Sequence, residues 1–134
     1  MEPTKIRNAQ MQLDVSEAVV NGSKFVKAML KDCLFQDVMM AGTRILDANL
    51  SDLEIEGAQL GGAYIHNIGM PPKGHPMYDP QAKMRPLKFE NCHLEGSVLE
   101  NCNLSGVELK DCNIKGLKID GVDIGELLNE HRKK

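Results

Sequence analysis

Large apolar residues in this 134-residue chain recur every five positions, a period that neither an α-helix nor a β-strand has. A first register runs from Val15 to Ile65, and a second register runs from Phe89 to Ile124. Such residue types make up about a third of the chain, so nineteen consecutive matches have odds of roughly one in 10⁹ before the choice of phase. The period therefore predicts a chain built from short structural repeats.

A second series of mainly small side chains lies two positions before each large residue. Residues two apart in an extended segment project to the same side, so each repeat is expected to turn one small and one larger group inward. All the cysteines fall at the small inward position, and free cysteine packs as a small hydrophobe. We expect a core that includes Leu50, Leu104 and the reduced, buried cysteines Cys33, Cys92, Cys102 and Cys112.

Turn-forming residues lie two positions after the large residues. Sixteen of the nineteen repeats have Gly, Asp or Asn there, and only Glu17, Lys27 and Glu126 depart. Gly, Asp and Asn tolerate positive φ or support turns with a side-chain hydrogen bond. Each repeat is therefore predicted to be a short extended side followed by a corner.

Two repeats carry a resemblance to a known family. Ala48-Asn49-Leu50-Ser51-Asp52 and Cys102-Asn103-Leu104-Ser105-Gly106 resemble the A(D/N)LXX unit of pentapeptide-repeat proteins. The resemblance covers residues 13–126 apart from one insertion. It implies an all-β fold, a right-handed quadrilateral β-helix with one repeat per side and four per coil. We expect a single domain over residues 1–134, with coils at about 13–70 and 87–126.

The repeat is interrupted between the two registers, where five of the six prolines fall. Ile65 and Phe89 are 24 residues apart, which is not a multiple of five, so the segment leaves the coil and re-enters in a new phase. This predicts a Pro-rich insertion loop over about residues 71–86. Long loops of this kind are often functional, and the alternative is a flap packed on one face of the coil.

A helix start signal follows the last repeats. Asp123 and Glu126 have the spacing of a capping box, which predicts a short helix over about residues 124–132. Positive charge from His131 to Lys134 suits the carboxyl end of such a helix. We expect the helix to cap the last coil; the alternative is that Leu127 and Leu128 form part of a dimer contact.

Positions directly before and after each large residue are expected to face outward, and several in the first register are apolar. Val19 is expected to align with Met39 on one side, and Val26 with Leu46 on the next. Exposed apolar patches often mark contacts, although the insertion loop is an alternative cover for this stripe. The candidate interaction surface consists of Val19, Val26, Met39, Leu46, Tyr64, His75 and Tyr78.

The sequence has no signature of catalysis or of a bound cofactor. It lacks a nucleophile-base pairing, a phosphate loop and paired carboxylates, and its cysteines lack zinc-finger spacing. His66, His75 and Asp79 lie close enough in sequence to meet in the insertion, but their spacing does not require a metal. We therefore expect no enzymatic activity, no cofactor and no metal.

Charge and hydropathy limit the partners. The net charge of -3 provides no general basic field for nucleic acid or anionic lipid, so we expect no direct nucleic-acid binding and no membrane contact. The first residues lack the apolar stretch of a signal peptide, and no run has the length of a membrane span. We expect a cytoplasmic protein.

Two functional hypotheses follow. The first is a non-enzymatic protein-interaction or scaffold module, whose partner is an unknown protein or a second copy bound through a solenoid end or the apolar stripe. The alternative, implied by the resemblance, is a DNA-mimicking modulator or protector of DNA gyrase or another topoisomerase. Mixed surface charge and a short rod disfavour the alternative, although acidic residues line part of the second register: Glu90, Glu95, Glu100 and Glu108.

Overall fold

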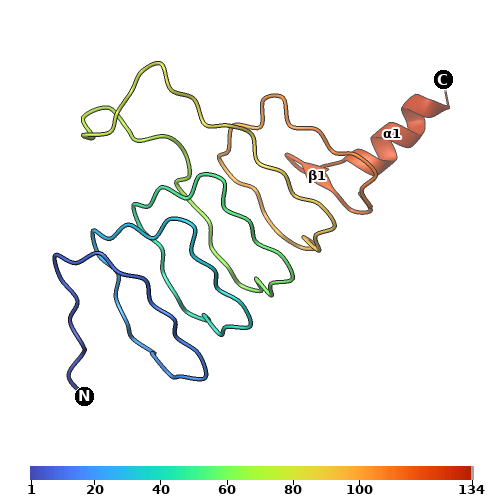
Figure 1. The fold of residues 1–134 in the computed structure, drawn as a ribbon. Coiled ribbons are helices and arrows are strands. Elements are labelled where there is room, and N and C mark those ends of the chain that lie inside the picture. Colours follow the sequence, from blue (N-terminus) through green and yellow to red (C-terminus); the bar gives the residue numbers. More distant parts are fainter. Residues whose placement is uncertain (134) are drawn as a thin grey trace. The chain divides into compact units, whose positions relative to one another are not determined.

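The computed structural model describes residues 1–133. The chain divides into two compact units, Met1–Gly62 and Ala63–Lys134, and each is described by itself. Within the described residues the regular elements are β1 (Lys118–Ile119), β2 (Val122–Asp123) and α1 (Ile124–Arg132), all in the second unit. Figure 1 shows the rest of each unit as backbone that bends repeatedly between short extended segments. Lys134 lies outside the described residues.

Positive φ angles recur at the predicted corners. Eighteen of the nineteen positions that follow a large residue by two have positive φ, from Glu17 to Asn67 and from Asn91 to Gly121. The exception is Glu126, which lies in α1. The predicted corners are thus confirmed, and they include Glu17 and Lys27, whose φ angles are 50° and 54° although neither is Gly, Asn or Asp.

Two kinds of corner alternate along the chain. Every second corner is a turn, and at six of these turns the carbonyl of the large residue accepts from the N–H three residues on: those after residues 20, 40, 50, 94, 104 and 114. Five of these six corners have Gly at φ between 75° and 79°, the value that the third residue of a type II turn requires. The intervening corners mostly have Asn or Asp near 50–56°, the left-handed region that these residues tolerate.

The asparagine of the repeat leads into the hydrogen-bonded corners. The Oδ1 atoms of Asn49, Asn103 and Asn113 accept from the N–H two residues on, at 3.1, 3.0 and 3.0 Å. Such a bond imitates a backbone turn and spans the large residue that lies between its partners. The Asn side chain therefore helps to fix the direction of the chain before the corner.

The residues of the predicted core are exposed in this structure, so their burial stays a prediction. Cys33, Cys92, Cys102 and Cys112 are exposed, Leu50 and Leu104 are 46% and 49% exposed, and none of the side chains of residues 1–133 is buried. The corner hydrogen bonds join residues three positions apart, so each bond fixes a corner and does not tie one coil to the next. The predicted β-helix is represented here by its corners and not by ladders of strands.

A hairpin replaces the last repeat. β1 pairs with β2 in antiparallel register, with Lys118 opposite Asp123 and Ile119 opposite Val122. The connecting residues Asp120 and Gly121 have φ of 48° and 80°. Positive φ at both positions is typical of a type I′ turn, for which Asp-Gly is a preferred sequence. The chain therefore reverses direction at Asp120 and Gly121, within residues that were expected to continue the coil.

The predicted helix is present as α1. The Oδ1 of Asp123 accepts from the N–H of Glu126 at 3.0 Å, which is the N-cap bond that the sequence predicts. The N–H of Ile124 also donates to the carbonyl of Leu117 at 2.9 Å, so the start of the helix is tied to the preceding corner. Residues here are among the few that are half-buried: Ile114, Leu117, Ile124 and Leu128.

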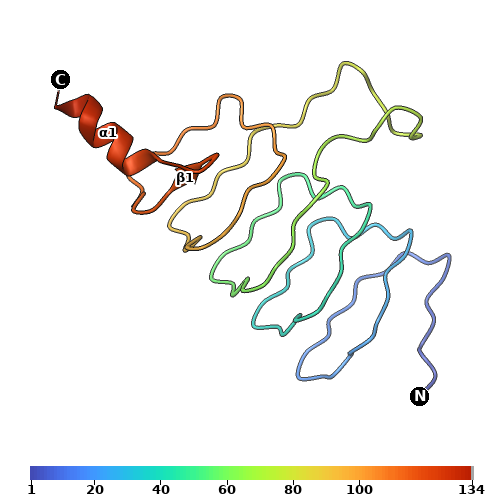
Figure 2. The ribbon, with the colours of Figure 1, turned by 180° about the vertical axis from the view of Figure 1, so that it is seen from behind.

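The insertion is a series of tight turns. Main-chain bonds close residues 72–75, 75–78 and 79–82, and Figure 2 shows this yellow-green segment departing from the regular bends of the second unit. Pro76 and Pro80 stand at the second position of the latter two turns, where the fixed φ of proline is favourable. His75 Nδ1 accepts from the N–H of Met77, and Asp79 Oδ1 accepts from the N–H of Gln81. The insertion therefore has local order of its own.

Candidate functional site

Residues directly before and after a large residue project to the same side of the chain. The rings of Tyr64 and His66 stack with centroids 3.9 Å apart and planes 11° apart. Lys88 Nζ lies 2.9 Å from Glu90 Oε2, and Lys110 Nζ lies 3.6 Å from Glu108 Oε1. Because each pair flanks one large residue, these contacts agree with the predicted alternation of inward and outward positions.

The residues of the candidate interaction surface fall in both units. Val19, Val26, Met39 and Leu46 lie in the first unit, where Met39 is 92% exposed. Tyr64, His75 and Tyr78 lie in the second unit and are exposed. Tyr64 stacks on His66, and the N–H of Tyr78 donates to the carbonyl of His75. The alignment of Val19 with Met39 and of Val26 with Leu46 stays a prediction.

Apolar outward residues gather in the first register. Met29 and Leu34 precede Leu30 and Phe35, and they are 84% and 82% exposed. Sequence reasoning missed both, although the positional rule that selected Val19 and Met39 also selects them. Outward positions of the second register are mainly charged, and Val98 is its exposed apolar outward residue. The two registers therefore present chemically different outer surfaces.

Basic residues of the two registers differ in their neighbours. Lys24 and Arg44 occupy outward positions whose partners two residues on are Val26 and Leu46. Within residues 1–133, neither Lys24 nor Arg44 has an ion-pair partner. In the second register, Lys88 and Lys110 each lie against a glutamate. The first unit thus leaves two cations beside exposed aliphatic side chains.

The Lys88–Glu90 pair carries the clearest electrostatic effect. The hydrogen bond from Lys88, followed by its positive charge, lowers the pKa of Glu90. The same hydrogen bond and the negative charge of Glu90 raise the pKa of Lys88. Both side chains are well exposed, so water screens the pair and its contribution to stability is small.

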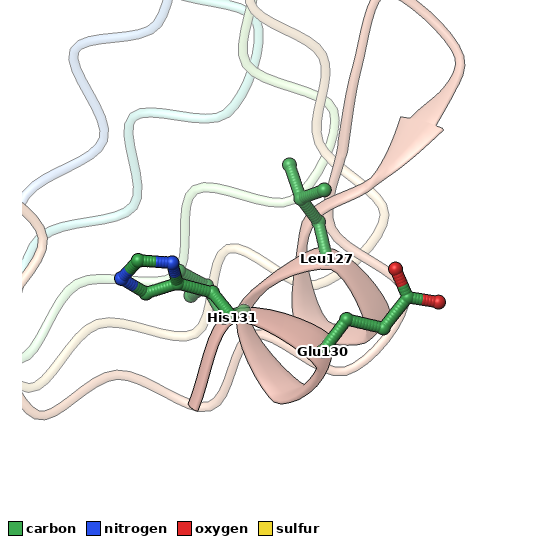
Figure 3. Close-up of a pocket in the computed structure, with 4 residues that line it drawn as sticks. Leu127, Glu130 and His131 are labelled. Carbon is green, nitrogen blue, oxygen red and sulfur yellow. The ribbon is translucent and has the colours of Figure 1, made fainter. Parts of the chain in front are cut away.

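Two surface hollows flank α1. The larger, about 620 Å³, lies between α1 and the corner at residues 112–116, and its lining includes Cys112, Lys115 and Arg132. The smaller, about 390 Å³, is lined by residues of the helix itself. Figure 3 shows Leu127, Glu130 and His131 of the smaller hollow projecting from α1 in different directions. Their polar groups do not converge on one point, so this hollow offers no built site for a ligand.

Thiols and imidazoles are engaged in local contacts. The Sγ atoms of Cys92 and Cys102 donate to the carbonyls of Glu90 and Glu100 at 3.3 Å, and Cys112 makes the same bond to Lys110 at 3.2 Å. His66 Nδ1 lies 3.3 Å from Asn67 Nδ2. Within the part of the chain that the structure describes, no three His, Cys, Asp or Glu residues are grouped for a metal ion.

No helix within residues 1–133 combines the length and the hydropathy that crossing a bilayer requires.

Comparison with known proteins concerns the second register. Residues 88–124 match the family model of pentapeptide repeats, in eight copies. Residues 88–124 carry pentapeptide repeats. The matched residues contain the eight large residues of the second register, from Phe89 to Ile124. Pentapeptide repeats in general form β-helical solenoids. No curated protein and no solved structure matches the chain.

The first register shares the local geometry of the matched pentapeptide repeats. It has the same positive φ every five residues and the same turn at every second corner. Asn49 makes the same side-chain bond as Asn103 and Asn113 of the matched segment. The two registers thus share the geometry of their corners, and the family match covers only the second.

Proposed function

We propose that this chain is a non-enzymatic protein-interaction module that uses the outward side of the first register as its contact surface. One observation carries the proposal: outward positions hold exposed apolar residues in the first register and mainly charged residues in the second. Exposed apolar groups that gather on one part of a surface are typical of contact sites. The second register is the solvated part of the scaffold.

The scaffold of this module is a right-handed quadrilateral β-helix, in which successive coils pack through both inward series. The repeat match and the regular corners support this closure. The accessible surface is 15,177 Å², whereas a compact protein of 14.8 kDa has about 7,000 Å². Packing the coils on one another removes the inward apolar side chains from water, which is the dominant favourable term in folding.

Thiol labelling tests this closure. In packed coils Cys92, Cys102 and Cys112 are covered, so a thiol reagent should label them much more slowly than it labels the urea-unfolded chain. The variant Ser105→Cys, which places a thiol at an outward position, should be labelled rapidly at that position in both conditions and serves as the control. Equal labelling rates for the native and unfolded chains would show that the coils stay open.

Site-specific photo-crosslinking tests the contact surface. A photoreactive phenylalanine analogue replaces Met39 in one variant and Glu108, an outward residue of the second register, in the other. In a lysate of the native cells, the first variant should form a discrete protein adduct and the second should not. Absence of an adduct at Met39, or equal adducts at both positions, would contradict the proposed surface. An adduct with a second copy of the chain would identify self-association as its use.

The DNA-mimicking alternative is less well supported. Such a function needs a continuous acidic surface that imitates the phosphate backbone. Glu90 and Glu108 of the second register each lie against a lysine, which neutralises two of its acidic positions. An interaction module accounts for the exposed apolar residues of the first register as its contact surface. A DNA-mimicking function gives these residues no role.

A further inference from the structure

We infer that the partner of this contact surface is an acidic polypeptide whose carboxylates alternate with apolar side chains. The inference rests on the proposed function and names the chemistry of the partner. Four residues of the first unit carry it, and we call them the basic–apolar face: Lys24, Val26, Arg44 and Leu46.

The basic–apolar face repeats one arrangement. A cation stands before the large residue and an aliphatic residue after it, first at Lys24 and Val26 and again at Arg44 and Leu46. These two pairs are twenty residues apart, which is four repeats. In a four-sided coil they fall on the same side, one coil apart, with the cations in one column and the aliphatic groups in the other.

The four side chains are available to a partner. Val26 and Leu46 are 72% and 60% exposed, and the two cations lack ion-pair partners within residues 1–133. Lys88 and Lys110 show the contrasting arrangement, because each has a glutamate two residues away on the same side. A partner can therefore bring carboxylates to Lys24 and Arg44 without displacing an ion pair that the first unit already makes.

An acidic polypeptide fits this face better than a nucleic acid does. The segment from Met1 to Gly62 has six basic and nine acidic residues, so it has no general basic field to attract a long polyanion such as DNA or an anionic membrane. A polypeptide can pair locally with two cations and cover the adjacent aliphatic side chains at the same time. An arginine guanidinium also binds a carboxylate through two hydrogen bonds, which fixes the orientation of the partner.

A fluorescein-labelled peptide of alternating glutamate and leucine is the probe, and fluorescence anisotropy is the measurement. The wild-type protein should bind it, and the double variant Lys24→Glu/Arg44→Glu should bind at least tenfold more weakly. A peptide with lysine in place of glutamate should bind that variant in preference to the wild type. The matched control Lys88→Glu/Lys110→Glu makes the same change of charge in the second register and should leave binding unaltered.

A second variant separates charge from apolar contact. Val26→Ser/Leu46→Ser keeps both cations and should also weaken binding of the glutamate–leucine peptide at least tenfold, with an unchanged circular dichroism spectrum. If the charge-reversed protein fails to fold, Lys24→Gln/Arg44→Gln replaces it with the same expected loss.

Three results would overturn the inference. They are no binding of the peptide to the wild type, an equal loss in the control variant, and binding to vesicles of anionic lipid in place of the peptide. If the peptide fails while Met39 still forms its discrete adduct, only the chemistry assigned to the partner is wrong. If the adduct is also absent, the proposed function itself is wrong.

Discussion

Single residues at the corners show how local backbone geometry selects side chains. Hydrogen-bonded corners mostly have Gly at φ above 70°, and the others mostly have Asn or Asp near 50–56°. Sequence reasoning placed all these corners, because Gly, Asn and Asp signal positive φ. It did not distinguish hydrogen-bonded corners from open ones, because that difference depends on whether a main-chain hydrogen bond closes the turn.

Lys27 is one of two corner residues, with Glu17, that have positive φ although they are not Gly, Asn or Asp. A side chain at φ of 54° places its Cβ close to the following carbonyl, which costs roughly 1–2 kcal/mol. We predict that Lys27→Gly stabilises the protein by up to about 1 kcal/mol, after subtracting the greater freedom of glycine in the unfolded chain. Urea unfolding measures the change. Lys24→Gly, which has no positive φ to relieve, should instead destabilise; equal effects of both substitutions would contradict this account.

Glu90 offers a residue-scale test of pH dependence. Its pKa is lowered by Lys88, so the pair stabilises the folded chain above the ordinary pKa of glutamate, and this stabilisation is lost as the pH falls through the lowered pKa. We predict that Lys88→Gln returns the pKa of Glu90 toward its ordinary value, as measured by NMR titration. Lys110→Gln removes a lysine that faces Glu108 and should not change the titration of Glu90. A titration of Glu90 that ignores Lys88 would exclude the pair in solution.

At the scale of elements, the end of the repeat shows competition between two sequence signals. Ile119 and Ile124 continue the five-residue period, which predicts another coil segment. Asp120-Gly121 also forms a two-residue turn with positive φ at both positions, and this turn reverses the chain. The structure has the hairpin at these residues. In contrast, α1 and its N-cap agree with the prediction, because no other sequence signal competed with Asp123.

Asp123 is expected to determine how firmly α1 begins. Asp123→Ala removes the oxygen that accepts from the N–H of Glu126 and should destabilise the helix by about 1 kcal/mol. Hydrogen exchange should become faster at the amide of Glu126. Glu126→Gln is the matched control, because the donor is the backbone N–H and is retained. Unchanged exchange in Asp123→Ala would mean that the bond to Leu117 suffices to hold the helix start.

Features of the whole molecule that depend on contacts between coils could not be predicted from the sequence. The repeats, the corners and the helix were predicted because each depends on residues a few positions apart. The burial of Cys92, Cys102 and Cys112 depends on contacts between coils, and these cysteines are exposed. Among the candidate surface residues, the period selected outward positions such as Met39, but it could not say which partner they contact.

Charge on the whole molecule leads to a negative prediction. The protein should not inhibit the supercoiling activity of DNA gyrase at micromolar concentration, because its net charge is only -3 and lysines neutralise part of its acidic surface. A gel assay of plasmid topology measures this. The variant Lys88→Glu/Lys110→Glu makes the surface more acidic and provides a comparison. Strong inhibition by the wild type that is lost in Glu95→Lys/Glu100→Lys would favour DNA mimicry.

The alternation of corners constrains how such a chain can change in length. Hydrogen-bonded corners return every ten residues, after Leu94, Leu104 and Ile114, and not after every repeat. A deletion of five residues would therefore move each later glycine from a hydrogen-bonded corner to an open one. It would also move each later Asn or Asp to a hydrogen-bonded turn, which needs a larger φ. A deletion or duplication of ten residues leaves each hydrogen-bonded corner and each open corner with its own residue type. The smallest block that recombination can exchange without penalty is thus a pair of repeats.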